Sequence, residues 1–393
     1  MKLLIQNGRV WQTNKFRKLD IFINHGEIIK LAKQLDHEVH DQSIDANGLV
    51  IIPGLIDVHV HLREPGYEYK ETIKTGSAAA RAGGYTTICC MPNTNPVIDN
   101  LTKLNQLQKK IVHDACVHVV PYVAITKKQK GKTLVNIPLL SQHCLAFSDD
   151  GAGVQSTSLM EQAMRMCAKV RKPIVTHCED ITQTGNAREY QEVARNLKLA
   201  QKTKCQLHIC HVSTKESVDL IKQHKSKLIT CEVTPHHLLL NQTDVQNHGA
   251  YKMNPPLASY QDQKALCRAL MDNTIDMIAT DHAPHSYQEK NTTYAQSLNG
   301  IVGLETAFSL IYTKFVKTHK ISFKRLIELM SINPAKVFHL PSHEIKIGQK
   351  ANLAIFDLKQ TWIINANKFK SKSHTTPFDG ISVLGKLKYT IVN

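Results

Sequence analysis

The sequence predicts an α/β fold, a (β/α)8 or TIM barrel with a small β-sandwich domain built from both chain termini. Eight short apolar, β-rich runs lie between residues 54 and 285, and segments with helical patterning separate most of them. Continuous apolar strands that alternate with helices indicate a closed parallel barrel. We therefore predict a barrel over residues 53–342 and a composite β domain formed by residues 1–52 and 343–393.

The barrel elements follow one another at regular intervals. In chain order, the expected strands are residues 54–60, 85–92, 117–125, 143–150, 173–180, 205–213, 227–237 and 275–285. Residues 75–83 and 158–172 are examples of the helical stretches between them. In such barrels the chemistry takes place at the carboxyl ends of the strands, which all meet at one rim.

The two ends of the chain differ from the barrel region in their sequence pattern, because they contain short strand-like segments joined by turns. Strand-like segments near the N-terminus contain the pairs Asn7-Gly8 and His25-Gly26, which favour tight turns between strands. Residues 345–358 and 387–393 are strand-like as well. Because both ends have this strand-like pattern, we predict that they pair into one β domain.

The chain is basic, and this raises the question of a nucleic-acid partner. Its 393 residues carry 49 Lys and Arg against 33 Asp and Glu, a formal net charge of +16. The densest basic cluster, residues 126–133, has no interleaved aromatic side chains. We expect a solvated loop there and no nucleic-acid partner, although a basic surface helps to attract an anionic metabolite.

The sequence offers no signal peptide and no membrane span. No N-terminal apolar run has the needed length, and no window approaches the ~18 apolar residues of a spanning helix. We therefore expect a cytoplasmic protein without a membrane partner. The ten cysteines are scattered and include no Cys-x-x-Cys pair, so free thiols are expected rather than disulfides or a cysteine zinc site.

Histidines and carboxylates stand at the ends of five expected strands. In chain order they are His59 and His61, the pair Asp149 and Asp150, His177, His211, and Asp281. Any one of them alone would be assigned as a cap or a core histidine. Together they place four histidines and two carboxylates, one of them from the Asp149–Asp150 pair, at the same rim, where buried aspartates need partners.

This donor set predicts a metal centre. Imidazoles and carboxylates without thiolates suit zinc or a similar divalent ion. Six ligands exceed what one tetrahedral zinc with an open position accepts, but they suffice for two ions bridged by a carboxylate. Metals lower the pKa of water, so the expected chemistry is hydrolysis or its reverse.

With these residues assembled, the chain resembles the dihydroorotases of the long-chain bacterial type, in the amidohydrolase superfamily. The resemblance runs through "PGLIDVHVHLREPG", "GGYTTICCMPNTNP", "FSDDGAGVQ", "EVTPHHLLL", "IDMIATDHAPH" and "GIVGLETAF" and covers nearly the whole chain. It implies zinc, one or two ions per subunit. His59, His61 and Asp281 would hold the first ion and His177 and His211 the second, with Asp150 as the bridge in place of the carboxylated lysine of many relatives. Asp281 would also be the catalytic proton shuttle.

The resemblance also implies a substrate site. Arg63 would grip the carboxylate of dihydroorotate with two parallel hydrogen bonds. The other implied contacts are His61, Asn93, Asn254, His285, Asn299 and Gly300. For the two asparagines next to proline, turn formation is the alternative role, and both roles can hold at once. The implied reaction is the reversible closure of N-carbamoyl-L-aspartate to L-dihydroorotate with loss of water, the third step of de novo pyrimidine biosynthesis.

Two other functions stay open at this point. The first is a hydantoinase- or allantoinase-like cyclic amidase, against which Arg63 argues. The second is a non-catalytic relative that serves aspartate transcarbamoylase as a partner, against which the six filled ligand positions argue. Two departures from the family pattern concern the pocket, namely the short segment between His177 and His211 and the residues Leu298-Asn299-Gly300 before "IVGLET". From the family we also expect a homodimer.

Overall fold

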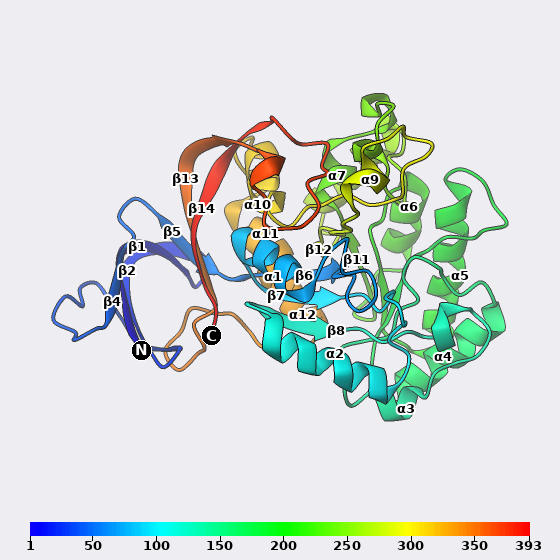
Figure 1. Cartoon of the computed structure of the whole chain (residues 1–393), viewed down its shortest axis with the longest axis horizontal. Helices are drawn as coiled ribbons and strands as arrows, with labels where there is room; N and C mark the ends of the chain where they lie inside the picture. Colours follow the sequence, from blue (N-terminus) through cyan, green and yellow to red (C-terminus); the bar gives the residue numbers. More distant parts are fainter.

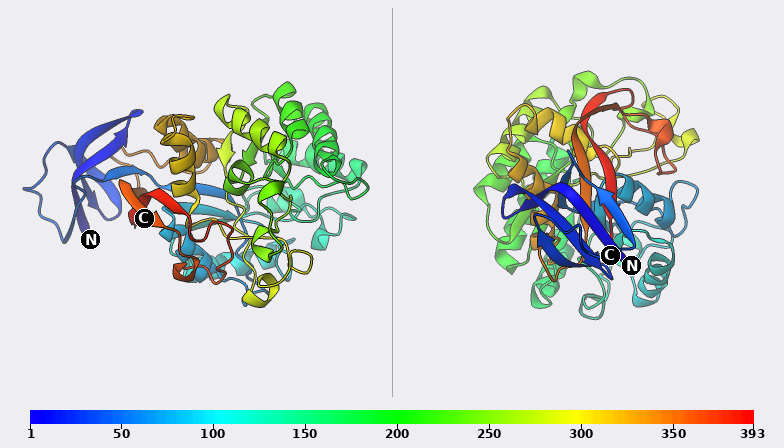
Figure 2. Two further views of the ribbon diagram at one scale, coloured as in Figure 1. Left: turned by 90° about the horizontal axis from the view of Figure 1, so that it is seen from above. Right: turned by 90° about the vertical axis from the view of Figure 1, so that its left-hand side faces the viewer.

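The computed structural model describes all residues from Met1 to Asn393. It shows a barrel of strands and helices with a small β domain at one end, where both termini lie (Figures 1 and 2). Seven named strands build the barrel: β6 (Leu55–Val60), β7 (Tyr85–Cys90), β8 (His118–Pro121), β9 (Ile174–Thr176), β10 (Leu207–Ile209), β11 (Ile229–Val233) and β12 (Met277–Ile278). All of their pairings are parallel.

Two isolated junctions close the barrel. A parallel bridge between Val60 and His282 joins the last strand to the first. On the other side, Phe147 bridges both Val123 and Ile174 and so connects the sheet β6–β8 to the sheet β9–β12. The (β/α)8 topology predicted from the sequence is therefore present.

The fourth predicted strand, residues 143–150, is wrong in its extent. Only Phe147 forms bridges, although the Ser148 N–H still donates to Val123 O and the Val175 N–H to Phe147 O, each at 2.9 Å. The chain leaves the ladder at Asp149, whose carboxylate accepts the N–H of Ile125 at 2.8 Å. That side-chain bond ends the strand and turns the next residue, Asp150, toward the barrel mouth.

Helices cover the outside of the barrel. They are α1 (Ile73–Ala82), α2 (Leu101–Asp114), α3 (Ile137–Leu140), α4 (Thr157–Lys169), α5 (Ala187–Thr203), α6 (Lys215–Gln223), α7 (Pro235–Leu239), α8 (Tyr260–Met271), α9 (Tyr287–Lys290), α10 (Ala307–Ile311), α11 (Phe323–Ile327) and α12 (Asn333–Val337). Short 3-10 turns are η1 (Lys127–Gln129), η2 (Gln242–Asp244), η3 (Gly249–Tyr251) and η6 (Ala366–Lys368), and π turns are η4 (Tyr312–Val316) and η5 (Glu328–Ile332). Side-chain caps start several helices, for example Thr72 at α1 and Ser156 at α4. Their apolar faces pack into a core cluster of 63 buried residues.

The strands near the two termini form one continuous sheet of seven strands rather than two separate sheets. They are β1 (Lys2–Gln12), β2 (Lys15–Asn24), β3 (Glu27–Ala32), β4 (Gln42–Asp45), β5 (Val50–Pro53), β13 (Leu353–Ile363) and β14 (Ser382–Ile391). The order is β14-β13-β5-β1-β2-β3, with β4 paired to β1. The sheet is strongly curved and holds its own buried cluster of twelve residues (Figure 1).

Of the two turns predicted near the N-terminus, one is right and one is wrong. His25 and Gly26, both with positive φ, join β2 to β3 as expected. Asn7 and Gly8 lie inside β1 instead, at a shift of register. There the Asn7 N–H donates to Asp20 Oδ1 at 2.8 Å, so a bulge replaces the turn.

Two further observations concern the whole chain. All ten cysteines are unpaired thiols, and eight of them are buried. No helix combines the length and the apolar character needed to cross a membrane.

Candidate metal centre and active site

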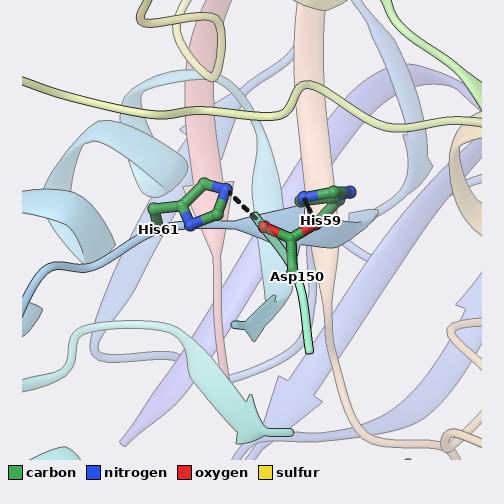
Figure 3. Close-up of side chains that lie close together, drawn as sticks. All are labelled: His59, His61 and Asp150. Carbon is green, nitrogen blue, oxygen red and sulfur yellow. Dashed lines mark ion pairs between the residues drawn. The ribbon is translucent and has the colours of Figure 1, made fainter. Parts of the chain in front are cut away.

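Asp150 lies at the centre of four imidazoles. Its Oδ1 is 3.4 Å from His59 Nε2, 3.8 Å from His211 Nε2 and 4.0 Å from His177 Nδ1. Its Oδ2 is 3.5 Å from His61 Nε2 (Figure 3). One carboxylate thus faces side chains from β6 and its carboxyl end and from the loops after β9 and β10.

Asp281 completes the cluster from the loop after β12. Its Oδ1 is 3.0 Å from His61 Nε2 and 3.5 Å from His59 Nε2. Asp281 has a φ of 47° and His211 a φ of 30°, which are backbone conformations that non-glycine residues rarely adopt and that concentrate at functional sites. The structure therefore brings all six sequence-proposed ligands together at the mouth of the barrel.

Three of the four histidines have their outer ring nitrogen occupied. His59 Nδ1 donates to Glu232 Oε1 at 2.6 Å, and His177 Nε2 donates to Glu179 Oε2 at 3.1 Å. His61 Nδ1 lies 3.0 Å from its acceptor on Asn93. In a neutral ring, a proton on the outer nitrogen leaves a lone pair on the inner one, which is how proteins prepare imidazoles to ligate metals.

Burial and charge at the centre also favour a cation. Burial by itself lowers the pKa of His59, but the carboxylates of Asp150 and Glu232 outweigh it and raise that pKa well above its usual value. Burial raises the pKa of Asp150, yet the neighbouring histidines, His59 first, hold it well below its usual range. The carboxylates of Asp150 and Glu232 thus stay ionised and attract positive charge.

Two orphaned atoms test whether a metal fits. His59 Nε2 and Asp150 Oδ1 are buried and have no hydrogen-bond partner, and such atoms are costly unless something satisfies them. Two groups of ligand atoms, each within 4.8 Å of one another, share Asp150, one with His59 and His61 and one with His177 and His211. The donors present therefore fit one or two divalent ions.

Glu232 is one residue near the site that sequence reasoning missed, and Glu179, the partner of His177, is another. Glu232 lies fully buried on β11, where Oε1 accepts from His59 and Oε2 accepts from His208 Nε2 at 3.0 Å. Burial raises its pKa, but the two imidazoles, His59 first, outweigh this and lower it to about 2. A lone glutamate inside an apolar strand was the available signal, because such a charge is buried only with partners.

Glu232→Gln is expected to weaken metal binding about 10- to 100-fold, the usual effect of removing the group that orients a ligand histidine. A glutamine cannot accept hydrogen bonds from both imidazoles, so His59 loses its fixed tautomer. Chelator competition followed by metal analysis measures the affinity. Glu64→Gln is the matched control, because that buried carboxylate pairs with Lys110 at 2.6 Å instead. Equal affinities for Glu232→Gln and wild type would contradict the assigned role.

Four of the expected substrate residues meet at one side of the centre. Arg63 Nε donates to Pro284 O at 3.0 Å, and Arg63 Nη2 lies 3.3 Å from His285 Nε2. His285 Nε2 lies 2.7 Å from Asn299 O. A Cβ at Gly300, whose φ is 137°, would come within 2.4 Å of a carbonyl oxygen, so this close approach requires glycine. The asparagine side chain is exposed, so residue 299 contributes its main chain to this group.

Of the other three expected contacts, His61 belongs to the candidate metal cluster itself, and Asn93 and Asn254 lie against candidate metal ligands. Asn93 accepts from His61, as described above. Asn254 Nδ2 donates to Glu179 Oε2 at 3.0 Å and lies 3.3 Å from His177 Nε2. A cavity of about 310 Å³ opens beside Asn254 and His177. Both asparagines therefore lie beside candidate metal ligands, and their contact with substrate stays a prediction.

Comparisons with known proteins identify the family and the fold of the chain. The family model described as "Dihydro-orotase-like" matches residues 48–195. Dihydroorotases from Staphylococcus aureus and Staphylococcus epidermidis are 45% and 43% identical to the chain, covering 99% of it and 97% of their own length. Among solved structures, the L-hydantoinase (dihydropyrimidinase) of Arthrobacter aurescens is similar with a TM-score of 0.90 at 25% identity, covering 99% of this chain and 94% of that one. The D-hydantoinase (dihydropyrimidinase) of a Thermus species has the same fold, with a TM-score of 0.87 at 24% identity over the same shares of the two chains. From its sequence, its barrel and its cluster of histidines and aspartates, this chain belongs to the dihydroorotase family.

Proposed function

We propose that the chain is a dihydroorotase, which interconverts N-carbamoyl-L-aspartate and L-dihydroorotate in the third step of de novo pyrimidine biosynthesis. One observation carries the choice of substrate: Arg63 stands beside the histidine–aspartate cluster with its terminal N–H groups turned to no acceptor except the contact at His285. A guanidinium in that state is ready for a carboxylate. Dihydroorotate has one on its ring.

We further propose zinc as the resident metal, in one or two copies. His59, His61 and Asp281 would hold one ion, His177 and His211 the other, and Asp150 would bridge them. A divalent ion bound there supplies polarisation of the amide carbonyl and a lowered pKa for water. The donor set of imidazole and carboxylate, together with the orphaned atoms on His59 and Asp150, supports this assignment.

Asp281 is the residue we assign to proton transfer. Burial raises its pKa, but the nearby histidines, His59 first, outweigh burial and lower that pKa, so the carboxylate is ionised and can accept a proton. In hydrolysis it takes a proton from the attacking water and gives it to the ring nitrogen as the amide bond breaks. In ring closure the same steps run backwards, and the proton moves from the carbamoyl nitrogen to the departing water.

The substrate assignment is tested by offering dihydroorotate and dihydrouracil to the purified protein. A dihydroorotase hydrolyses the carboxylated ring faster, whereas a hydantoinase-like amidase, the function named for the similar Arthrobacter structure, would prefer dihydrouracil. The second outcome would reject our assignment. A chain that binds metal but hydrolyses neither would be the non-catalytic relative.

Arg63→Met is expected to lower kcat/KM for dihydroorotate by about 100-fold or more, because it removes two charge-assisted hydrogen bonds of roughly 1.5–3 kcal/mol each. Metal content should stay at the wild-type level. Steady-state kinetics and metal analysis measure the two quantities. Arg165→Met, at an exposed site on α4, is the control for removing a guanidinium. Loss of metal in Arg63→Met would point to a structural role.

Three further expectations remain predictions. They are a homodimer, a cytoplasmic location, and aspartate transcarbamoylase as a partner. Light scattering of the purified chain, alone and mixed with the transcarbamoylase, measures the first and the last.

A further inference from the structure

The buried lysine Lys70 contacts His285, one of the expected substrate residues. Lys70 ends the turn that starts at Arg63, in which Tyr67 N donates to Arg63 O at 3.0 Å and Lys70 N to Tyr67 O at 2.9 Å. Only 8% of Lys70 is exposed. Its Nζ lies 3.0 Å from His285 Nδ1 and 3.0 Å from Glu289 Oε1. One turn therefore directs two cations, Arg63 and Lys70, at the two nitrogens of a single imidazole.

The surroundings hold the ammonium in place. The rings of Tyr67 and Tyr69 each lie 5.5 Å from Lys70 Nζ, which suits cation–π contact. Tyr69 Oη donates to Glu289 Oε1 at 3.1 Å, so the carboxylate that pairs with Lys70 is itself fixed. An ammonium confined in this way keeps its direction toward His285.

The contacts of His285 define which nitrogen carries the proton. An ammonium only donates, so Nδ1 must present its lone pair to Lys70. A carbonyl oxygen only accepts, so Nε2 must donate to Asn299 O, 2.7 Å away. The ring is then neutral with its proton on Nε2. Burial first, and then Arg63 and Lys70, lower the pKa of His285 to about 3, in keeping with a neutral ring.

This tautomer decides what Arg63 can do. With a proton on Nε2, the 3.3 Å contact between Arg63 Nη2 and His285 Nε2 brings two donors together and is no hydrogen bond. The guanidinium then keeps its terminal N–H groups for another acceptor. The alternative tautomer, with its proton on Nδ1, would also find an acceptor, because Glu289 Oε2 lies 3.5 Å from Nδ1. In that state Nε2 would accept from Arg63 and Asn299 O would lose its donor.

We propose that Lys70 is a positioning residue that holds His285 in the Nε2–H tautomer and so keeps the Arg63 guanidinium free for the substrate carboxylate. The proposal rests on the proposed dihydroorotase function for the identity of that carboxylate. The choice between the two tautomers is a property of the chain itself, and it can be measured without substrate.

Nitrogen NMR of protein with 15N-labelled histidine tests the tautomer directly. The His285 signals are assigned by their absence in His285→Gln. In wild type we expect an unprotonated Nδ1 and a protonated Nε2, and in Lys70→Met a shift toward protonated Nδ1. Lys70→Arg, which restores a donor, should return the wild-type pattern, and Glu289→Gln, which removes the ion pair but not the Lys70 donor, should keep it. A protonated Nδ1 in wild type, or an unchanged pattern in Lys70→Met, would overturn the proposal.

Kinetics supply the second arm. Lys70→Met is expected to raise KM for dihydroorotate about tenfold, one lost charge-assisted bond, while kcat changes little. Lys74→Met, at an exposed position on α1, is the matched control and should leave both constants unchanged. If the wild-type protein does not hydrolyse dihydroorotate, the proposed function is rejected, and the NMR measurement alone then tests the tautomer. Active wild type with an unchanged KM in Lys70→Met would reject the positioning role alone.

Discussion

Asp281→Asn is expected to lower kcat for dihydroorotate hydrolysis by about 10²- to 10⁴-fold, the range usual for removing a general acid–base group. The asparagine keeps the size and one oxygen of the carboxylate, so the side chain can still lie against His59 and His61. It cannot accept a proton at neutral pH, however, and the proton of the attacking water has no other assigned receiver. Because binding groups such as Arg63 are untouched, KM should change much less than kcat.

Metal analysis separates the two roles assigned to Asp281. A variant that retains its metal but has lost turnover has lost the proton shuttle. A variant that has lost both has lost a ligand, and its rate then says nothing of proton transfer. Asp219→Asn, which changes an exposed carboxylate paired with Lys215 at 2.9 Å, is the control. A kcat within tenfold of wild type would refute the assignment of Asp281 as the shuttle.

The convergence of the candidate metal ligands could be predicted from sequence because it follows from topology. His61 and Asp281 are 220 residues apart, yet their side chains lie 3.0 Å from each other. Parallel strands in a closed barrel place all their carboxyl ends at one rim, so a polar residue at the end of each apolar run is enough to predict a cluster. The fold and the centre therefore needed no knowledge of distances.

Features that depend on pairing could not be predicted in the same way. Asn7 and Gly8 form a bulge rather than a turn because Asp20, across the sheet, binds the main chain there. The fourth strand stops soon after Phe147, where the Asp149 carboxylate accepts the N–H of Ile125 from the neighbouring strand segment. Such outcomes depend on contacts between distant segments, which a local pattern does not contain.

The same limit applies to the residues that support the site. Glu232 has to be placed on the strand beside His208 and next to His59 before its role can be recognised. Lys70 acts on His285 across 215 residues of sequence. Ligands stand out by their chemical type, whereas the groups that orient them are recognised only by what they touch.

Asp150→Asn is expected to have the largest effect of the substitutions considered. It should lose most of the bound metal and lower kcat/KM by about a thousandfold or more, equivalent to ~4 kcal/mol. Asp150 faces all four histidines of the centre, and both candidate metal groups share it. An amide presents one oxygen instead of two and carries no charge, so it cannot bridge two cations. Metal analysis of the purified variant, with kinetics in the same preparation, measures both losses.

The neighbouring Asp149 provides a control that differs from Asp150 by one position. Its carboxylate is equally buried but binds the N–H groups of Ile125 and Thr126, at 2.8 and 3.1 Å, outside the metal cluster. Asp149→Asn should therefore retain metal while lowering the free energy of unfolding by about 1–3 kcal/mol, because a charge-assisted bond is weakened. If Asp149→Asn instead lost metal as fully as Asp150→Asn, the effect would belong to the shape of this loop, and the bridging role of Asp150 would lose its support.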